Sequence, residues 1–203
     1  MIAILTADII NSAGHETAEW MHLLKETLSG WGATPNDWEI YRGDEFQLRS
    51  SPEKALQIAI ELKARLKVIK DLDLRIAIGL GDEDYRGAGI SESNGTAYQR
   101  SGRMLDKLKS QRKNMGIDTG DAHRNRSLNL VIDLSSDFMD NWTPVSAEMV
   151  ALSLASPYST QSEMAGELKI KQSAVSQRRK RARYPLVQQV LEFYTETVKE
   201  LES

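Results

Sequence analysis

The first 80 residues alternate between apolar runs of strand length and amphipathic stretches of helix length, and this alternation constrains the fold most strongly. A nearly continuous apolar run such as Ile2 to Ile9 is typical of a strand buried on both faces. Two short strands joined by Arg42-Gly43-Asp44 are interpreted as a hairpin. The predicted elements are, in order, strand 2–9, helix 17–29, strands 38–41 and 45–49, helix 51–69 and strand 72–80.

This order of elements predicts a ferredoxin-like (βαββαβ) domain of the α+β class. An additional helix and a short strand follow it, and the polar segment 120–127 is interpreted as a linker. We therefore predict a first domain at 1–122 and an all-α domain at 127–203. The elements expected after residue 80 are helix 95–109, strand 115–119, helices 128–140 and 144–155, a helix-turn-helix at 160–183 and helix 185–201.

The helix-turn-helix is the strongest functional signal in the sequence. Thr160 is placed as the N-cap of its first helix, and the small Ala165 allows the two helices to cross closely. Residues 169–171 form the turn, and the second helix begins at Gln172 with side chains that can read base edges. Basic side chains suited to phosphates follow them. The residues expected to contact DNA are Gln172, Ser173, Ser176, Gln177, Arg178, Lys180 and Arg181, with Arg179 and Arg183 as further cations.

Basic residues are concentrated in this segment. From Lys169 to Leu191 there are seven Lys or Arg and no acidic residue, whereas the rest of the chain has 19 basic and 29 acidic residues, a net charge of −10. A basic island on an otherwise acidic protein is the charge distribution of a nucleic-acid contact. A solvated basic helix and a helix that contacts another protein remain alternatives. Together with the turn spacing, the charge favours double-stranded DNA as the partner.

The amino-acid composition limits the classes of protein to which the chain can belong. The chain has 203 residues, 40% of them hydrophobic and 27% charged, which is ordinary for a globular protein. It has no cysteine, so disulfides and cysteine-ligated metals are excluded, and its three histidines lack metal-ligand spacing. The N-terminus lacks the basic region of a signal peptide, and no uncharged apolar run approaches a membrane span. We therefore expect a cytoplasmic protein with no membrane partner.

Two aspartates of the first domain are candidates for a metal site. Asp8 lies near the end of the first strand and Asp44 at the tip of the hairpin expected beside it. Paired carboxylates at a strand end can bind divalent cations together with a triphosphate. Gly43 would leave room for a ligand, and Asn11 and Ser12 lie at a turn into a helix, where backbone N–H groups can hold phosphate. Alternatively, Asp8 caps a helix and Asp44 is a turn residue.

Short motifs in the first 110 residues resemble the core motifs of class III nucleotide cyclases. They are Ala7-Asp8-Ile9, Arg42-Gly43-Asp44-Glu45-Phe46 and Arg75 to Gly81. The hairpin is also similar to the GGDEF signature of diguanylate cyclases. The resemblance implies that Asp8 and Asp44 hold Mg²⁺ or Mn²⁺ on a nucleoside triphosphate. The segment 95–103 resembles the cyclase helix that carries an Asn and a transition-state Arg, which places Gln99 and Arg103 at those catalytic positions.

Three positions differ from these families. Gln99 stands in place of the Asn, Ile40 in place of a base-selecting Lys, and Arg42 in place of the first Gly of the diguanylate motif.

Over nearly its full length the chain is most similar to the SatD family. The shared segments are Asp8 to Ser12, Trp38 to Asp44, Ser91 to Gly95 and Asp140 to Thr143, followed by the helix-turn-helix.

These observations together predict a DNA-binding transcriptional regulator. Its cyclase-like domain is expected to be catalytically degenerate and to sense a nucleotide or a metal–nucleotide complex. The alternatives are an active nucleotidyl cyclase with a DNA-binding appendage, and a scaffold in which both sites are structural. A homodimer is expected, through the first domain or the helix at 185–201, because a helix-turn-helix commonly uses two half-sites. The resemblance implies the same, since cyclase sites are completed across a dimer.

Overall fold

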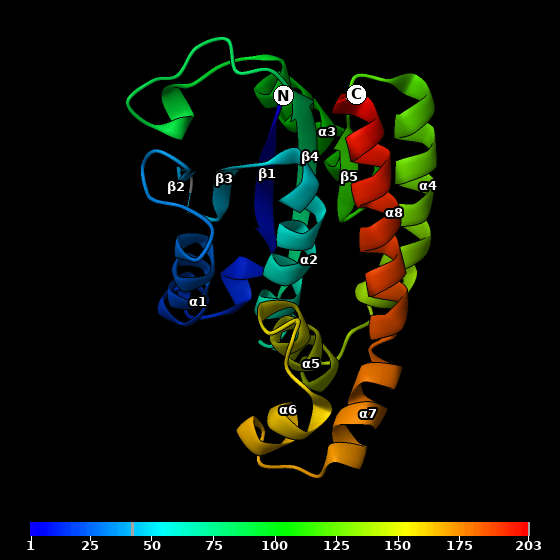
Figure 1. Cartoon of the computed structure of the whole chain (residues 1–203). Helices are drawn as coiled ribbons and strands as arrows, with labels where there is room; N and C mark the ends of the chain where they lie inside the picture. Colours follow the sequence, from blue (N-terminus) through cyan, green and yellow to red (C-terminus); the bar gives the residue numbers. More distant parts are fainter. Residues whose placement is uncertain (42, 203) are drawn as a thin grey trace.

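The computed structural model describes residues 1–41 and 43–202, so Arg42 at the predicted hairpin tip lies outside the described residues. Over the described chain the protein is of the α+β class, with one mixed five-stranded sheet and eight α-helices (Figure 1). None of the helices in these residues is long and apolar enough to cross a membrane. The strands are β1 (Ile2–Ile10), β2 (Trp38–Ile40), β3 (Glu45–Ser50), β4 (Asp73–Gly81) and β5 (Met115–Asp118).

The strand order in the sheet is β2-β3-β1-β4-β5. β1 is central and pairs antiparallel with β3 on one side and with β4 on the other, whereas β5 pairs with β4 in parallel. The register places Asp8 directly opposite Glu45 of β3 and Arg75 of β4. Three charged residues therefore lie in one row across three neighbouring strands, near the end of β1.

The two faces of the sheet are covered differently because side chains of a strand alternate between faces. Ala3, Leu5, Ala7 and Ile9 of β1 belong to the main apolar core, which also contains α1 (Thr17–Ser29) and α2 (Ala55–Leu66) residues. The opposite face is covered by α3 (Thr96–Gln111). At Gly79 and Gly81 of β4 an added Cβ would collide with the start of α3, so these glycines permit close packing of helix on sheet.

The remaining helices are α4 (Ala122–Met139), α5 (Pro144–Ala155), α6 (Gln161–Glu167), α7 (Gln172–Arg181) and α8 (Tyr184–Glu202). α4 packs on β5, α5 packs on α2, and α8 lies beside α4, whereas α6 and α7 form one end of the molecule (Figure 1). The main core is continuous from the sheet into these helices, since it includes Leu56, Leu128, Ala147 and Val187.

The predicted linker at 120–127 is wrong, because α4 begins at Ala122. Its N-cap is Asp121, whose side chain accepts a hydrogen bond from the Arg124 backbone N–H at 2.8 Å. Within α4, the Asn129 amide both accepts from Ile117 N at 2.9 Å and donates to Ile117 O at 2.8 Å. Its polar side chains thus satisfy the backbone of edge strand β5 rather than face solvent in a linker.

Candidate functional site

Asp8 is the centre of a cluster of four charged residues on the face of the sheet that α3 covers. Its Oδ2 atom accepts a hydrogen bond from Arg75 Nη1 at 2.9 Å and lies 4.0 Å from Lys109 Nζ. Lys109 also donates to Glu45 Oε1 at 2.8 Å. We call Asp8, Glu45, Arg75 and Lys109 the β1 charge cluster. It holds two acids and two cations, so each carboxylate has a side-chain counter-ion.

Burial and neighbouring charges act in opposite directions on Asp8. Burial raises the pKa of Asp8 above its usual value, and Arg75 and then Lys109 oppose this shift. The neighbouring carboxylates of Glu45 and Asp44 raise the pKa of Asp8 further by repulsion. The hydrogen bond to Glu45 in turn raises the pKa of Lys109. The charged form of Asp8 in this partly buried position is therefore stabilised by Arg75 and Lys109.

Asp44 lies beside the end of β1, as the sequence predicted. Its backbone oxygen accepts a hydrogen bond from Ile9 N at 3.2 Å, and its Oδ2 atom accepts one from Ser12 Oγ at 2.7 Å. Gly43 has a φ of 71°, and an added Cβ would meet nothing within 4 Å. The left-handed backbone favours glycine at this position, and the space beside it is open.

The phosphate-binding turn expected at Asn11 and Ser12 has a different form. Ser12–Gly14 is a short 3₁₀ turn, and α1 begins only at Thr17, so these two residues do not form the start of a long helix. Asn11 has a φ of 66°, and its Nδ2 atom donates to Asp71 O at 2.9 Å. Both side chains are engaged in fixing loops at this end of the sheet.

The residues present do not fit a two-metal centre at Asp8 and Asp44. Asp8 is paired with Arg75 and lies near Lys109, which supply the positive charge that a cation would bring. Asp44 accepts a hydrogen bond from Ser12. Among the described residues, no group of three or more His, Asp or Glu side chains is placed to hold a metal ion. The aspartates are close together, but their nearest partners are side chains of the protein.

Gln99 and Arg103, the positions matched to the cyclase catalytic helix, both lie on the exposed side of α3. Within the part of the chain that the structure describes, no hydrogen bond or ion pair joins either of them to Asp8 or Asp44. Lys109, farther along α3, reaches Asp8 instead. The same helix contacts β1 at Ser101, whose hydroxyl lies 2.8 Å from that of Thr6, and Lys109 follows eight residues later. The sequence alone did not specify this register between α3 and β1.

Arg75→Gln is expected to lower the stability of the fold at pH 7 by at least about 1 kcal/mol, because it leaves a partly buried carboxylate with a weaker counter-ion. The pKa of Asp8, already raised by burial, should rise further. The folded state then binds a proton at a higher pH than the unfolded chain, so stability falls as pH rises through the folded pKa. Urea denaturation from pH 4 to 7 measures the free energy of unfolding of the variant and of the parent. The difference between them should shrink towards pH 4.

The matched control for Arg75→Gln is the double variant Asp8→Asn, Arg75→Gln. Because asparagine does not titrate, the extra pH dependence of the single variant should disappear in the double variant. An Arg75→Gln protein whose stability relative to the parent does not change with pH would show that Arg75 is not the main counter-ion of Asp8.

The residues predicted to contact DNA lie on α7, which together with α6 forms one end of the molecule (Figure 1). Gln172, Ser173, Ser176, Gln177, Lys180 and Arg181 are all exposed, whereas Val175 between them is buried. Val175 packs with Met149 of α5 and with Met164 and Ala165 of α6 in a small apolar core of its own. α7 therefore presents one polar and basic face to solvent from a packed three-helix support.

Local interactions fix α6 and the turn before α7. Thr160 and Glu163 form a capping box, with Glu163 N donating to Thr160 Oγ1 at 3.2 Å and Thr160 N to Glu163 Oε2 at 2.6 Å. In the turn, Lys169 has a φ of 53°, and Ile170 packs against the small core. Gln172 Nε2 donates to Gln161 Oε1 at 2.7 Å, which connects the first residues of α6 and α7.

The basic residues of this segment divide into two groups. Arg178 Nη1 donates to Glu148 Oε2 of α5 at 3.3 Å, and Arg179 lies over the Tyr184 ring at 4.6 Å. Arg183 lies over the Phe138 ring at 5.6 Å. Lys180 and Arg181, by contrast, have no ion pair or cation–π contact with any residue that the structure describes. Of the phosphate contacts predicted, Arg178 is thus engaged within the protein, while Lys180 and Arg181 are available.

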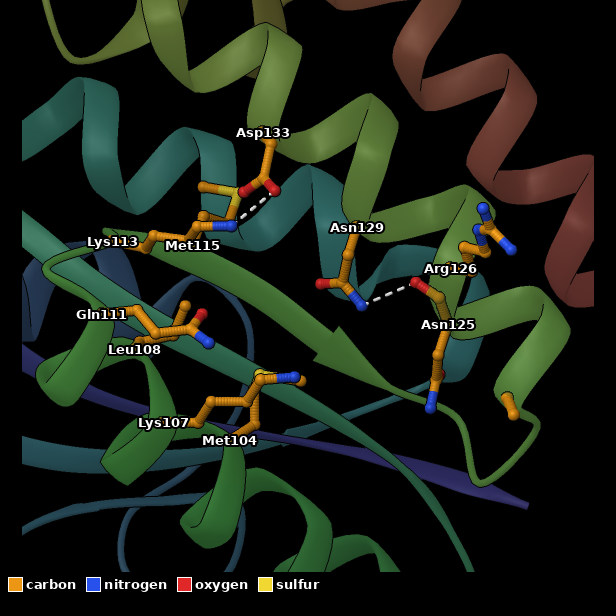
Figure 2. A pocket seen from close by; sticks show the side chains of 11 residues that line it. Met104, Lys107, Leu108, Gln111, Lys113, Met115, Asn125, Arg126, Asn129 and Asp133 are labelled. Carbon is orange, nitrogen blue, oxygen red and sulfur yellow. Dashed lines mark hydrogen bonds and ion pairs between the residues drawn. The ribbon is translucent and has the colours of Figure 1, made fainter.

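A separate cleft of about 380 Å³ lies between α3, β5 and α4 (Figure 2). Met104, Leu108 and Met115 supply its apolar part, and Lys113 pairs with Asp133 at 2.6 Å on one side. Its asparagines bind the β5 backbone. Most of its polar groups are thus engaged within the protein, and the cleft is a joint between the sheet and α4. Sequence motifs did not indicate it because its lining comes from three separate elements.

No protein-family model matches the chain, and no curated protein matches it.

Proposed function

We propose that this chain is a DNA-binding transcriptional regulator in which α6 and α7 form a helix-turn-helix. The observation that carries the proposal is the exposed face of α7, which is polar at its start and basic at its end, on a helix whose other side is packed. A recognition helix needs this combination, because its inner side must fix its angle while its outer side enters the major groove. The capping box of α6 and the Ile170 contact in the turn support the same reading.

The exposed side chains of α7 would have two different roles in DNA recognition. Gln172 and Gln177 would discriminate bases through their amides, and the contact with Gln161 would hold Gln172 in position before DNA binds. Lys180 and Arg181 would bind phosphates, which supplies affinity but little sequence preference. Arg178 would instead hold α7 against α5 through Glu148. Ser173 and Ser176 complete the surface that faces the groove.

For the sheet region we propose a cyclase-like palm domain that is catalytically degenerate and serves regulation, with a nucleotide as its ligand. The order β2-β3-β1-β4, in which β1 pairs antiparallel with β3 and β4, supports the ferredoxin-like plan. The β1 charge cluster argues against catalysis, because Arg75 and Lys109 neutralise the aspartate that a metal would need. This architecture is also the one that a SatD-like protein would have.

An active nucleotidyl cyclase is the second candidate, favoured by the proximity of Asp8 and Asp44. Incubation of the protein with Mg²⁺ or Mn²⁺ and each nucleoside triphosphate distinguishes the two, because only the enzyme yields a cyclic product. Formation of such a product, lost in Asp44→Asn, would replace the regulatory proposal for the sheet region. It would leave the DNA-binding proposal intact.

Several contacts connect the sheet to the proposed DNA-binding helices. Trp142 Nε1 donates to Ala182 O, next to the end of α7, at 2.9 Å. Tyr194 of α8 donates to Pro52 O, before α2, at 2.6 Å, and Tyr184 to Ser153 O at 3.1 Å. Only two residues separate the end of α7 from the start of α8. A movement in the sheet region could therefore be transmitted to α7 through packed elements.

The proposal predicts binding to duplex DNA that weakens steeply with salt. Each phosphate contact releases counterions, so the logarithm of the binding constant should fall linearly with the logarithm of the salt concentration. Fluorescence polarisation with labelled fragments from the source genome measures the slope, and competition with unlabelled fragments finds the preferred sequence. A chain that binds no duplex at low salt, or binds all of them without dependence on salt, would refute the proposal.

A further inference from the structure

An apolar surface runs along the outer side of α4 and α8. Leu130 and Leu134 of α4 are 60% and 67% exposed, and Leu186 and Phe193 of α8 are 42% and 38% exposed. These four are among the ten large hydrophobic side chains exposed in the described chain, and they gather on two neighbouring helices. Single exposed apolar residues are ordinary, but a group of this kind indicates a contact surface.

Three of them, Leu134, Leu186 and Phe193, border a groove of about 340 Å³ between the two helices, and Leu130 lies one turn before Leu134 on α4. α4 and α8 run in opposite directions side by side (Figure 1). The ion pair between Arg124 and Glu200, at 2.7 Å, shows that the start of α4 lies beside the end of α8. At the other end Arg183 lies over the Phe138 ring. The groove is lined by Val131, Leu134, Ser135, Phe138, Arg183, Leu186, Gln189, Val190 and Phe193. Two ridges of exposed leucine and phenylalanine therefore border an apolar floor.

Charged residues at the two ends of this surface match the ends of a second copy. Arg126 of α4 and Glu196 of α8 are exposed at the end near the Arg124–Glu200 pair, and Asp137 and Arg183 are exposed at the end near α7. Arg126, Asp137 and Glu196 form no ion pair within the described residues. In Figure 2 the guanidinium of Arg126 points away from the cleft that its backbone borders. Each end thus carries one acid and one base, on different helices.

We propose that the α4–α8 surface is the interface of a homodimer whose two-fold axis runs along these helices. α4 of each copy then lies against α8 of the other, with Leu130 and Leu134 packed on Leu186 and Phe193 of the second copy. Arg126 pairs with Glu196 of the second copy at one end. Asp137 pairs with Arg183 of the second copy at the other end. A two-fold contact repeats every interaction twice, so the surface is self-complementary as such an interface requires.

The direction of the axis follows from the position of α7, and this step depends on the proposed function. α7 continues into α8 at the end of the groove where Arg183 lies. With the axis parallel to α8, both α7 helices lie at the same end of the dimer and can face one duplex. An axis perpendicular to α4 would place the two copies of Arg126 and Asp137 opposite each other and the α7 helices at opposite ends. Two half-sites on one duplex favour the first arrangement.

The test uses the full chain without DNA, so that a failure of DNA binding does not affect it. Sedimentation equilibrium should show a dimer at micromolar concentration, and Leu134→Asp should raise its dissociation constant at least about 100-fold, because the loss occurs twice. Leu134 is exposed, so the melting temperature of the monomer should change little. The control is Val145→Asp on α5, 47% exposed and outside the groove, which should leave the dimer unchanged. A monomeric parent, or a dimer insensitive to Leu134→Asp, would overturn the proposal.

Charge reversal tests the arrangement of the helices. Arg126→Glu and Glu196→Arg should each weaken the dimer, by about 10-fold for two rim pairs, and the double variant should recover most of the loss. If Asp137→Arg rather than Glu196→Arg rescues Arg126→Glu, the axis is perpendicular to α4 and the proposed arrangement is wrong. Recovery with Glu196→Arg alone supports the parallel axis.

Discussion

Replacing Lys180 and Arg181 together by glutamate is expected to lower the affinity of the chain for duplex DNA at least about 100-fold at low salt. Both side chains are exposed at the end of α7 and have no partner among the described residues, so no intramolecular contact is lost. The variant should therefore fold normally. If each cation contacts one phosphate, the double variant to alanine should also flatten the salt slope by about two units. Fluorescence polarisation titrations at several salt concentrations give both quantities.

The matched control is Lys25→Glu on α1, an exposed lysine that changes the charge of the chain by the same amount per site but lies far from α7 along the fold. It should shift affinity little. Gln172→Ala should have a different effect on DNA binding. It should lower the preference for the correct base at one base pair, by about 1–3 kcal/mol of binding free energy. Equal weakening by Lys25→Glu and by either α7 substitution would mean that net charge, and not the α7 surface, governs binding.

The helix boundaries were predictable because caps and periodicity are local properties of the sequence. The helices at 17–29 and 144–155 begin and end where predicted, and α7 begins at Gln172 as expected. The hairpin was also predicted, with β3 one residue longer than expected. These elements carry their own signals, such as Pro144 at the start of α5 and the capping residue Thr160 before α6.

Contacts between segments distant in the sequence were predictable only where the expected pairing of two strands brought the segments together. The proximity of Asp8 and Asp44 followed from the expected pairing of the first strand with the hairpin, and the structure confirms it. The counter-ions of Asp8 were missed, because Arg75 and Lys109 reach it from a strand and a helix whose register the sequence did not specify. The linker error had a similar origin, since polar side chains that serve a sheet edge look the same in sequence as solvated ones.

The largest omission concerns Lys63 of α2. The helix at 51–69 was predicted, but a lysine in an amphipathic helix would ordinarily point to solvent. In the structure Lys63 is completely buried, with its Nζ atom 2.5 Å from Asp73 Oδ1 and 2.7 Å from Asp140 Oδ1. Lys67 adds a bond to the Asp140 backbone oxygen at 2.8 Å. This network joins α2 and β4 to the end of α4, so it connects the sheet to the helices that lead to α7.

Lys63→Met is therefore expected to destabilise the fold by about 3 kcal/mol or more, because it removes one partner of a buried ion pair and leaves carboxylates without their counter-ion. Asp73 retains Lys67 as a counter-ion, at 3.0 Å, so the unpaired carboxylate is mainly that of Asp140. Urea denaturation monitored by tryptophan fluorescence measures the loss. The control is Lys54→Met, an exposed lysine just before the same helix, where a change within about 0.5 kcal/mol is expected.

A second substitution separates the charge from the packing of the Lys63 side chain. In the double variant Lys63→Met, Asp140→Asn the carboxylate that lost its counter-ion is gone, while Asp73 keeps Lys67. Much of the stability should then return, because a buried ion pair contributes little net stability over uncharged groups of similar shape. A loss under about 1 kcal/mol for Lys63→Met would mean that water reaches the two carboxylates and that the network is not a rigid joint. A large loss that the double variant does not recover would assign the role of Lys63 to the packing of its aliphatic chain, and the connection between sheet and helices would then depend on the apolar core.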